Sequence, residues 1–226
     1  MKVIAIIPAR GGSKGIKDKN IILFCGKPLI SYTIEQAKQS SLIDDVYVSS
    51  DSDQILNISE IAGAKSIKRP EEISGDFATS ESALIHSIKQ ICNNEECIIV
   101  FLQATSPLRH VEDLNNAIKK FQESNSDSLF SCVDAGDVCL WSTKNNVESI
   151  TYNSNNRKRR QDFDSYVIEN GSFYITKSSS LIQSGNRLSG KISFYNMERW
   201  KIHEIDDIDD LQLCEYLYKT KILDKK

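Results

Sequence analysis

The sequence predicts an α/β fold in which helices flank a mostly parallel sheet and an inserted arm leaves that sheet. Strand-like and helix-like segments alternate over the first two-thirds of the chain, as in parallel strands joined by crossover helices. The runs at residues 3–9 and 97–102 are continuously apolar, which is typical of strands buried on both faces. Residues from about 135 to 170 are polar and irregular. We interpret them as an insertion, a dimer arm or a lid, within a single domain of residues 1–226.

The first part of the chain is predicted to hold two strand–helix units and a short third strand. These elements lie, in order, at residues 3–9, 29–39, 45–50, 53–62 and 64–68. The first helix begins after Pro28, because proline fits the start of a helix. Gly63 ends the second helix, since glycine readily adopts the left-handed conformation that closes a helix.

The remaining elements continue the alternation and then break it. Helix, strand, helix and strand are predicted at residues 80–91, 97–102, 112–122 and 128–133, followed by two strands and a closing helix at 172–176, 191–197 and 209–219. The helix from Ser80 starts with a capping-box pattern, and Ala83, Leu84 and Ile88 fall on one face of it. That face is expected to pack on the sheet.

The composition excludes several classes of protein. The chain is 40% hydrophobic and 26% charged, as in ordinary globular proteins, and its net charge of −3 gives no reason to expect a nucleic-acid partner. It has no apolar run of about 18 residues, so we expect no membrane span. Strand-like sequence begins at the N-terminus and leaves no room for a signal peptide, so a cytoplasmic location is expected. The six cysteines form no CxxC pair, which favours reduced thiols over a zinc site or disulfides.

A glycine-rich basic loop, "RGGSKG", follows the first strand at residues 10–15. In open α/β sheets, ligands bind at the carboxyl ends of the strands. Small residues let a phosphate approach the backbone N–H groups, and Arg10, Lys14 and Lys19 add positive charge. The loop fits neither the GxxxxGK[ST] nor the GxGxxG pattern. It therefore predicts a phosphate site of another kind, the alternative being a basic surface turn.

Neutral polar residues follow the strand at 97–102 in the motif "LQATSPLR", residues 102–109. Gln103, Thr105 and Ser106 supply hydrogen-bond donors and acceptors that suit a ligand with many hydroxyls and a carboxylate. The alternative is a Thr-Ser-Pro turn that caps the next helix.

Acidic residues gather in "HEIDDIDDL", residues 203–211. In an extended segment, Glu204 and Asp206 point to the same side and repel each other unless a cation lies between them. Oxygen ligands of this kind suit Mg²⁺, which usually takes one or two protein carboxylates beside substrate phosphates. The alternative, an acidic helix N-terminus, fits the later aspartates better.

A cationic run, "RKRR", precedes an aromatic strand within residues 157–175, and the two are joined by an Asn-Gly turn. Such a run is usually a solvated surface or a localisation signal. The alternative is that Arg160 serves an anionic site, in this subunit or in a partner subunit.

Together these motifs resemble those of the acylneuraminate cytidylyltransferases, also called CMP-sialic acid synthetases. "IIPARGGSKGIKDKNI" is similar to that family's nucleotide-binding signature, and "RPEEISGDFATSES", "LQATSPLR" and the acidic segment follow in the family's order. "RRQDFDSYVIENGSFYI" is similar to the version found in animal enzymes and some bacterial ones. The resemblance extends from about residue 3 to 215. It implies a Rossmann-like sheet of the nucleotide-diphospho-sugar transferase type.

The resemblance also implies an activity and a site. The activity joins CTP to a nine-carbon acidic sugar, giving a CMP-sugar and pyrophosphate, in a homodimer that uses Mg²⁺. The implied roles are triphosphate binding by Arg10, Ser13, Lys14 and Lys19, cytidine binding by Asn20, Arg69 and Ser80, sugar binding by Gln103, Thr105, Ser106 and Tyr174, a contribution to the neighbouring site by Arg160, metal binding by Glu204 and Asp206, and catalysis by Arg10, Lys14, Lys19 and Asp206.

The chain departs from the family pattern at three places, of which the last two leave the sugar open. Glu204 stands where an aspartate is usual. The arginine that some bacterial members carry before the Asn-Gly turn is absent, since this chain has Ile168 and Glu169 there. A lysine of the dimer arm is replaced near Trp141. KDN, legionaminic acid, pseudaminic acid and Kdo are therefore alternatives to N-acetylneuraminic acid. A non-catalytic nucleotide-binding protein is disfavoured, because binding alone would not require the acidic pair.

Overall fold

The apolar runs of the sequence become the strands of one sheet in the computed structural model, which describes residues 1–13, 15–93, 95–157, 159, 162 and 166–224. In the described part of the chain this sheet has seven strands in the order β11-β7-β10-β6-β1-β4-β5. Their bounds are β1 Lys2–Pro8, β4 Asp45–Ser50, β5 Lys65–Lys68, β6 Cys97–Leu102, β7 Ser128–Asp134, β10 Val167–Lys177 and β11 Ile192–Met197. Neighbouring strands are parallel except at β10, which is antiparallel to both β6 and β7.

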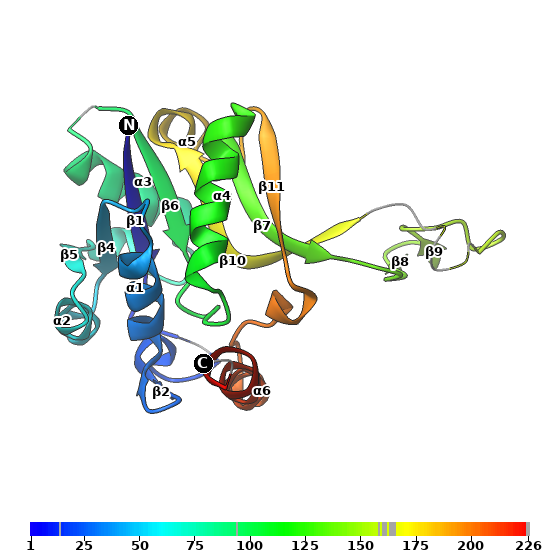
Figure 1. Ribbon diagram of the computed structural model, residues 1–226, viewed down its shortest axis with the longest axis horizontal. Helices are drawn as coiled ribbons and strands as arrows, with labels where there is room; N and C mark the ends of the chain where they lie inside the picture. Colours follow the sequence, from blue (N-terminus) through cyan, green and yellow to red (C-terminus); the bar gives the residue numbers. More distant parts are fainter. Residues whose placement is uncertain (14, 94, 158, 160–161, 163–165, 225–226) are drawn as a thin grey trace.

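Helices cover both faces of the sheet (Figure 1). They are α1 Leu29–Gln39, α2 Asp53–Ile61, α3 Ser80–Ile91, α4 Val111–Ser124, α5 Ser178–Ser184 and α6 Ile208–Tyr218. Successive side chains of β1 point to opposite faces of the sheet, as the pleat of a strand requires. Val3, Ala5 and Ile7 pack with α1, α2 and α4, whereas Ile4 and Ile6 pack with α3 and α5. The predicted α/β fold with a mostly parallel sheet is confirmed.

A third apolar cluster lies below the sheet and joins the two ends of the chain. Ile16 of the loop after β1 and Ile205 are buried there with residues of α1 and α6. A small hairpin of β2 (Leu23–Phe24) and β3 (Lys27–Pro28) contributes Phe24 to the same cluster. The cluster therefore fixes the glycine-rich loop against the acidic segment.

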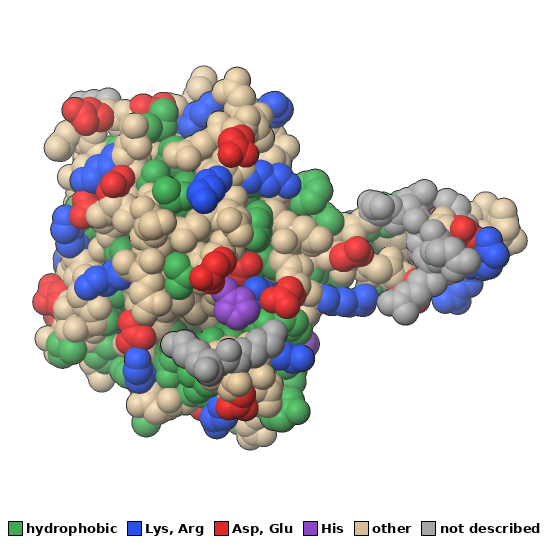
Figure 2. Space-filling view, viewed as in Figure 1, with side chains coloured by type: hydrophobic (Ala, Val, Ile, Leu, Met, Phe, Trp, Pro, Cys, Tyr) green, Lys and Arg blue, Asp and Glu red, His purple; other side chains and the backbone are tan. Residues whose placement is uncertain are grey.

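The arm leaves the sheet between β7 and β10 and stands away from the body of the molecule (Figures 1 and 2). It carries a short hairpin, β8 (Trp141–Ser142) with β9 (Glu148–Ser149). Residues 167–169 pair with β7, so the first residues of β10 belong to the sheet rather than to the predicted insertion of 135–170. Among the described residues no helix combines the length and the apolar character needed to span a membrane.

The Asn-Gly pair of β10 differs from its prediction. The sequence analysis placed a turn there, but β10 runs through Asn170 and Gly171 without reversing. Its register against β7 shifts between Glu169 and Tyr174, and Gly171 has a φ of +65°. The pair therefore lies in a β-bulge, in which extra residues of β10 bend the strand and redirect its side chains.

The central position of β6 gives a test of the core. Ile99 is fully buried in this strand, so Ile99→Ala is expected to lower the free energy of unfolding by about 2–5 kcal/mol. Ile182→Ala is the matched control, because Ile182 is 47% exposed on α5 and surface changes cost about 0.5 kcal/mol or less. Urea titration would measure both. Equal midpoints for the two variants would contradict this description of the core.

Candidate active site

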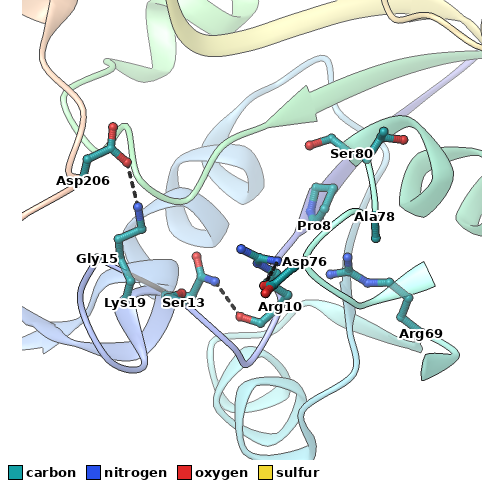
Figure 3. A pocket seen from close by; sticks show the side chains of 12 residues that line it. Pro8, Arg10, Ser13, Gly15, Lys19, Arg69, Asp76, Ala78, Ser80 and Asp206 are labelled. Atoms are coloured by element: carbon teal, nitrogen blue, oxygen red, sulfur yellow. Dashed lines mark hydrogen bonds and ion pairs between the residues drawn. The ribbon is translucent and has the colours of Figure 1, made fainter. Parts of the chain in front are cut away.

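A cavity of about 540 Å³ opens at the carboxyl end of β1. Six of the parallel strands end at this edge of the sheet, and the antiparallel β10 begins there. The predicted site residues that line the cavity are Arg10, Ser13, Lys19, Asn20, Arg69, Ser80 and Asp206 (Figure 3). Lys14 and Arg160, also predicted, lie outside the described residues. The structure thus brings the predicted nucleotide-binding residues together, while their roles stay predictions.

The glycine-rich loop is held by one side chain from the end of β4 and one from the short helix at Lys19–Ile21. Gly11 donates its backbone N–H to Asp51 at 3.0 Å, and Asn20 donates its amide to the Arg10 carbonyl at 3.0 Å. A Cβ on Gly15 would lie 2.5 Å from the Asp206 carbonyl oxygen. Only glycine permits this approach, which brings the loop and the acidic segment into contact.

Two cations of the cavity are paired with carboxylates. Arg10 lies 3.2 Å from Asp76, and Lys19 lies 2.8 Å from Asp206, both drawn as dashed lines in Figure 3. Both pairs are partly exposed, so each contributes little to stability. A bound polyphosphate can therefore compete for either cation at small energetic cost.

Arg69 is the buried cation at the far side of the cavity. It is 6% exposed and donates to the Ser49 carbonyl at 2.8 Å. Its Nε atom is buried and has no partner among the described protein groups. Burial lowers the pKa of Arg69. The charge of Asp51 acts in the opposite direction, and the charge of Arg10 lowers this pKa further. A buried donor without a partner indicates a position where a ligand or a water molecule accepts the hydrogen bond.

The predicted sugar-binding residues lie beside this cavity, around the loop after β6. Gln103 donates to the Glu204 carboxylate at 3.1 Å, and the Thr105 carbonyl accepts from the Ile205 N–H at 2.8 Å. The Ser106 hydroxyl is buried without a partner among the described groups. Tyr174 is buried on β10 and hydrogen bonds to Glu169. The loop therefore joins the acidic segment to the bulged strand.

The orientation of the acidic pair, Glu204 and Asp206, is determined by Ile205 between them. Ile205 is fully buried in the third apolar cluster, which turns Glu204 and Asp206 away from that cluster. Burial raises the pKa of Glu204, and the charge of Asp206 raises it further. Two oxygen ligands with mutual repulsion form a donor set that suits a hard divalent cation.

Arg109 is a buried residue that the sequence analysis missed. Its guanidinium is 1% exposed and donates to the Gln103 carbonyl at 2.7 Å and the Ser172 carbonyl at 2.9 Å. It also reaches Thr33 of α1 at 3.1 Å. Burial lowers the pKa of Arg109 to about 9. The motif "LQATSPLR" contained this residue, but an arginine in a polar loop usually faces solvent.

Asn170 of the bulge is a second residue that the sequence analysis missed. Its side chain accepts from the Ser131 hydroxyl at 2.7 Å and donates to the Lys201 carbonyl at 3.0 Å. It therefore links β7 and β10 to the segment that leads into Glu204. Arg109 and Asn170 together fix the two sides of the Gln103–Glu204 contact.

Comparison with known proteins gives the family. A family described as cytidylyltransferase matches residues 4–226. The chain belongs to this family. A pseudaminic acid cytidylyltransferase of Campylobacter jejuni is 33% identical over 226 residues, covering 97% of both chains. The chain is also 36% identical over 218 residues to N-acylneuraminate cytidylyltransferase A of Danio rerio, and 31% identical over 215 residues to N-acylneuraminate cytidylyltransferase of Streptococcus agalactiae.

Those N-acylneuraminate relatives are longer proteins. The chain spans about half of their length, 49% and 52% respectively. Among solved structures, a CMP:2-keto-3-deoxy-manno-octonic acid synthetase complexed with CTP has a TM-score of 0.75 at 17% identity, covering 98% of this chain and all of the other. A 4-diphosphocytidyl-2C-methyl-D-erythritol synthase of Anaerococcus prevotii has a TM-score of 0.67 at 13% identity, covering 96% of each chain. These confirm the fold, and the sequence relatives confirm the predicted family.

The bulge offers a test of the site of this cytidylyltransferase. A Cβ on Gly171 would lie 3.1 Å from both the Gln103 amide nitrogen and a Glu204 carboxylate oxygen. Gly171→Ala should therefore displace this contact, and kcat/KM in CTP-dependent turnover should fall by about tenfold or more. Gly185→Ala is the control, because its φ of +67° imposes the same strain while nothing lies within 4 Å of its Cβ position.

Both glycine variants should lose about 1–2 kcal/mol of stability from the left-handed backbone, and Gly171→Ala should lose somewhat more because its Cβ meets Gln103 and Glu204. Denaturant titration and steady-state rates would be measured side by side. If Gly171→Ala and Gly185→Ala retained equal activity, the close packing under Gln103 would have no part in turnover.

Proposed function

We propose that the protein transfers CMP from CTP to an acidic nine-carbon sugar, N-acetylneuraminic acid or a close relative, and releases pyrophosphate. The observation that carries this proposal is the arrangement of the two halves of the site. The cavity with Arg10, Lys19 and Arg69 is also lined by Asp206, which is two residues from the Glu204 that contacts Gln103. A nucleotide and a sugar bound in these halves would meet at Asp206.

Within this proposal the cavity orients CTP by charge. Arg10 and Lys19 bind the triphosphate and stabilise the departing pyrophosphate, with Ser13 as a further donor, and the same role is proposed for Lys14. Arg69, Asn20 and Ser80 hold the cytidine, where the unpartnered Nε–H of Arg69 supplies a hydrogen bond. Positioning and charge neutralisation are the main means of catalysis in reactions at phosphorus.

The sugar half orients the second substrate. Gln103, Thr105 and Ser106 bind it from the loop after β6, and Tyr174 forms a wall of its pocket. The 2-hydroxyl of the sugar attacks the α-phosphate in line. Glu204 and Asp206 fit Mg²⁺ by their oxygen donors, and bound Mg²⁺ would neutralise phosphate charge and acidify the attacking hydroxyl.

The arm supports the homodimer that is part of this proposal. Leu140, Trp141, Val147 and Ile150 are exposed on it, and a second copy of the chain would cover these apolar side chains. Arg160, which lies outside the described residues, is proposed to contribute to the neighbouring site. A cytoplasmic enzyme acting on small molecules, without a nucleic-acid or membrane partner, completes the proposal.

A related sugar acid is the second candidate. The Campylobacter jejuni relative is a pseudaminic acid cytidylyltransferase that matches over 97% of both chains. KDN, legionaminic acid, pseudaminic acid and Kdo therefore stay in the proposal as alternatives to N-acetylneuraminic acid.

The direct test is pyrophosphate release with CTP, Mg²⁺ and each of N-acetylneuraminic acid, KDN, legionaminic acid, pseudaminic acid and Kdo. We expect one nine-carbon acid to react much faster than the others. That result would identify the substrate. Binding of CTP without turnover of any of the five would contradict the sugar part of the proposal.

The acidic pair gives a sharper test. Asp206→Asn should lower Mg²⁺-dependent turnover by about 10²-fold or more, because a ligand is lost where charge develops. Asp209→Asn is the control, since Asp209 lies in the first turn of α6 and outside the cavity lining. Far-ultraviolet circular dichroism should show both variants folded. Wild-type turnover of Asp206→Asn at saturating Mg²⁺ would refute the metal assignment.

A further inference from the structure

Arg187, in the connection between α5 and β11, is held in a fixed pose although no motif contains it. Its guanidinium carbon lies 4.8 Å from the centroid of the Phe101 ring and 4.8 Å from that of Tyr174. These rings stack on each other at 5.4 Å across β6 and β10. The Nε–H group of Arg187 donates to Glu81 at 2.6 Å. Stacking and hydrogen bonding together restrict the planar group to one orientation.

The neighbours of Arg187 connect it to both halves of the site. Glu81 follows Ser80, which lines the nucleotide cavity. Tyr174 hydrogen bonds to Glu169, and Phe101 lies two residues before Gln103, which contacts Glu204. Arg187 therefore lies beside the proposed sugar pocket, at the end marked by Tyr174.

The chemistry of the pair limits what it can bind. The side chains of Arg187 and Glu81 are only 20% and 17% exposed, and their opposite charges compensate each other. Within the described part of the chain, Glu81 is the hydrogen-bond partner of this guanidinium, so its terminal amino groups remain as donors. Because its charges cancel, the Arg187–Glu81 pair favours binding of a neutral group of a ligand over binding of a carboxylate. An amide matches it, because the amide carbonyl accepts from arginine and the amide N–H donates to a carboxylate.

The geometry of the sugar places such an amide at this end. In these acids the carboxylate and the reacting hydroxyl share one carbon, which must lie near Asp206 and the α-phosphate. Arg187 contacts Tyr174, Phe101 and Glu81 rather than the acidic pair. The groups carried farther along the sugar ring, among them the acylamino group, would therefore face Arg187.

We propose that Arg187 is a specificity-determining residue that donates hydrogen bonds to the acylamino carbonyl of the sugar, with Glu81 orienting it. This inference rests on the proposed function. It assigns to the pair a preference for acids that carry an acylamino group over KDN, in which a hydroxyl replaces that group.

The test compares wild type with Arg187→Met, which keeps the packing on the two rings but removes the donors. The probes are CTP, Mg²⁺, the best acylamino acid of the five-sugar panel, and KDN. We expect kcat/KM for the acylamino acid to fall by about tenfold or more, as in sites built to hydrogen bond a substrate group. The KM for CTP and the rate with KDN should change by less than about twofold, so the preference between the two acids narrows.

Lys177→Met is the matched control, because it removes a different ion pair, that of Lys177 at the end of β10 with Asp127 at 2.7 Å, and should leave the preference unchanged. Arg187→Leu also removes the donors, and it replaces Arg187→Met if that variant does not fold. Where KDN reacts too slowly to measure, the test is whether Arg187→Met raises the KM for the acylamino acid while the KM for CTP stays unchanged.

Failure of the proposed function and failure of the inference about Arg187 give different results. If the wild type turns over no acid of the panel, the proposed function is wrong and this inference is lost with it. If the wild type is active but prefers KDN or Kdo to every acylamino acid, only the inference is wrong. An equal loss with both acids, a parallel rise in the KM for CTP, or no change in Arg187→Met would also overturn it.

Discussion

The buried guanidinium of Arg109 is the interaction on which the site depends. Its five hydrogen bonds join the loop after β6, the bulge of β10 and helix α1. Among the described residues its acceptors are carbonyl, hydroxyl and amide oxygens, and no carboxylate forms an ion pair with it. Burying a charge without a counterion is costly, and the full set of hydrogen bonds offsets that cost. Because the backbone of Gln103 is one of the acceptors, the position of the loop is fixed from below.

The acidic segment is fixed by a different kind of force. Ile205 lies in an apolar cluster with Ile16 of the glycine-rich loop, and the close approach at Gly15 brings that loop against Asp206. Hydrophobic burial thus sets the direction of Glu204 and Asp206, while hydrogen bonds set Gln103 opposite them.

Much of the fold could be predicted because local signals agreed with tertiary structure. Helix 29–39 and strand 97–102 were predicted with the bounds that the structure has, since their apolar patterns are long and uninterrupted. The cavity residues could be placed because strand ends meet at one edge of a sheet. Strand β10 was predicted too short, because the polar run from Glu169 to Ser172 interrupts its pattern. The roles of Arg109 and Arg187 come from partners distant in sequence, such as Ser172 and Glu81, which no local pattern encodes.

The bulged strand has a mechanical consequence. β10 is the continuation of the arm into the sheet, and β6 and β7 hold it along both edges. It cannot slide without breaking two ladders, so the direction in which the arm emerges is set by the core. The same strand carries the bulge below Gln103 and the ring beside Arg187. A force that displaces the arm would therefore be transmitted along β10 to the residues of the site.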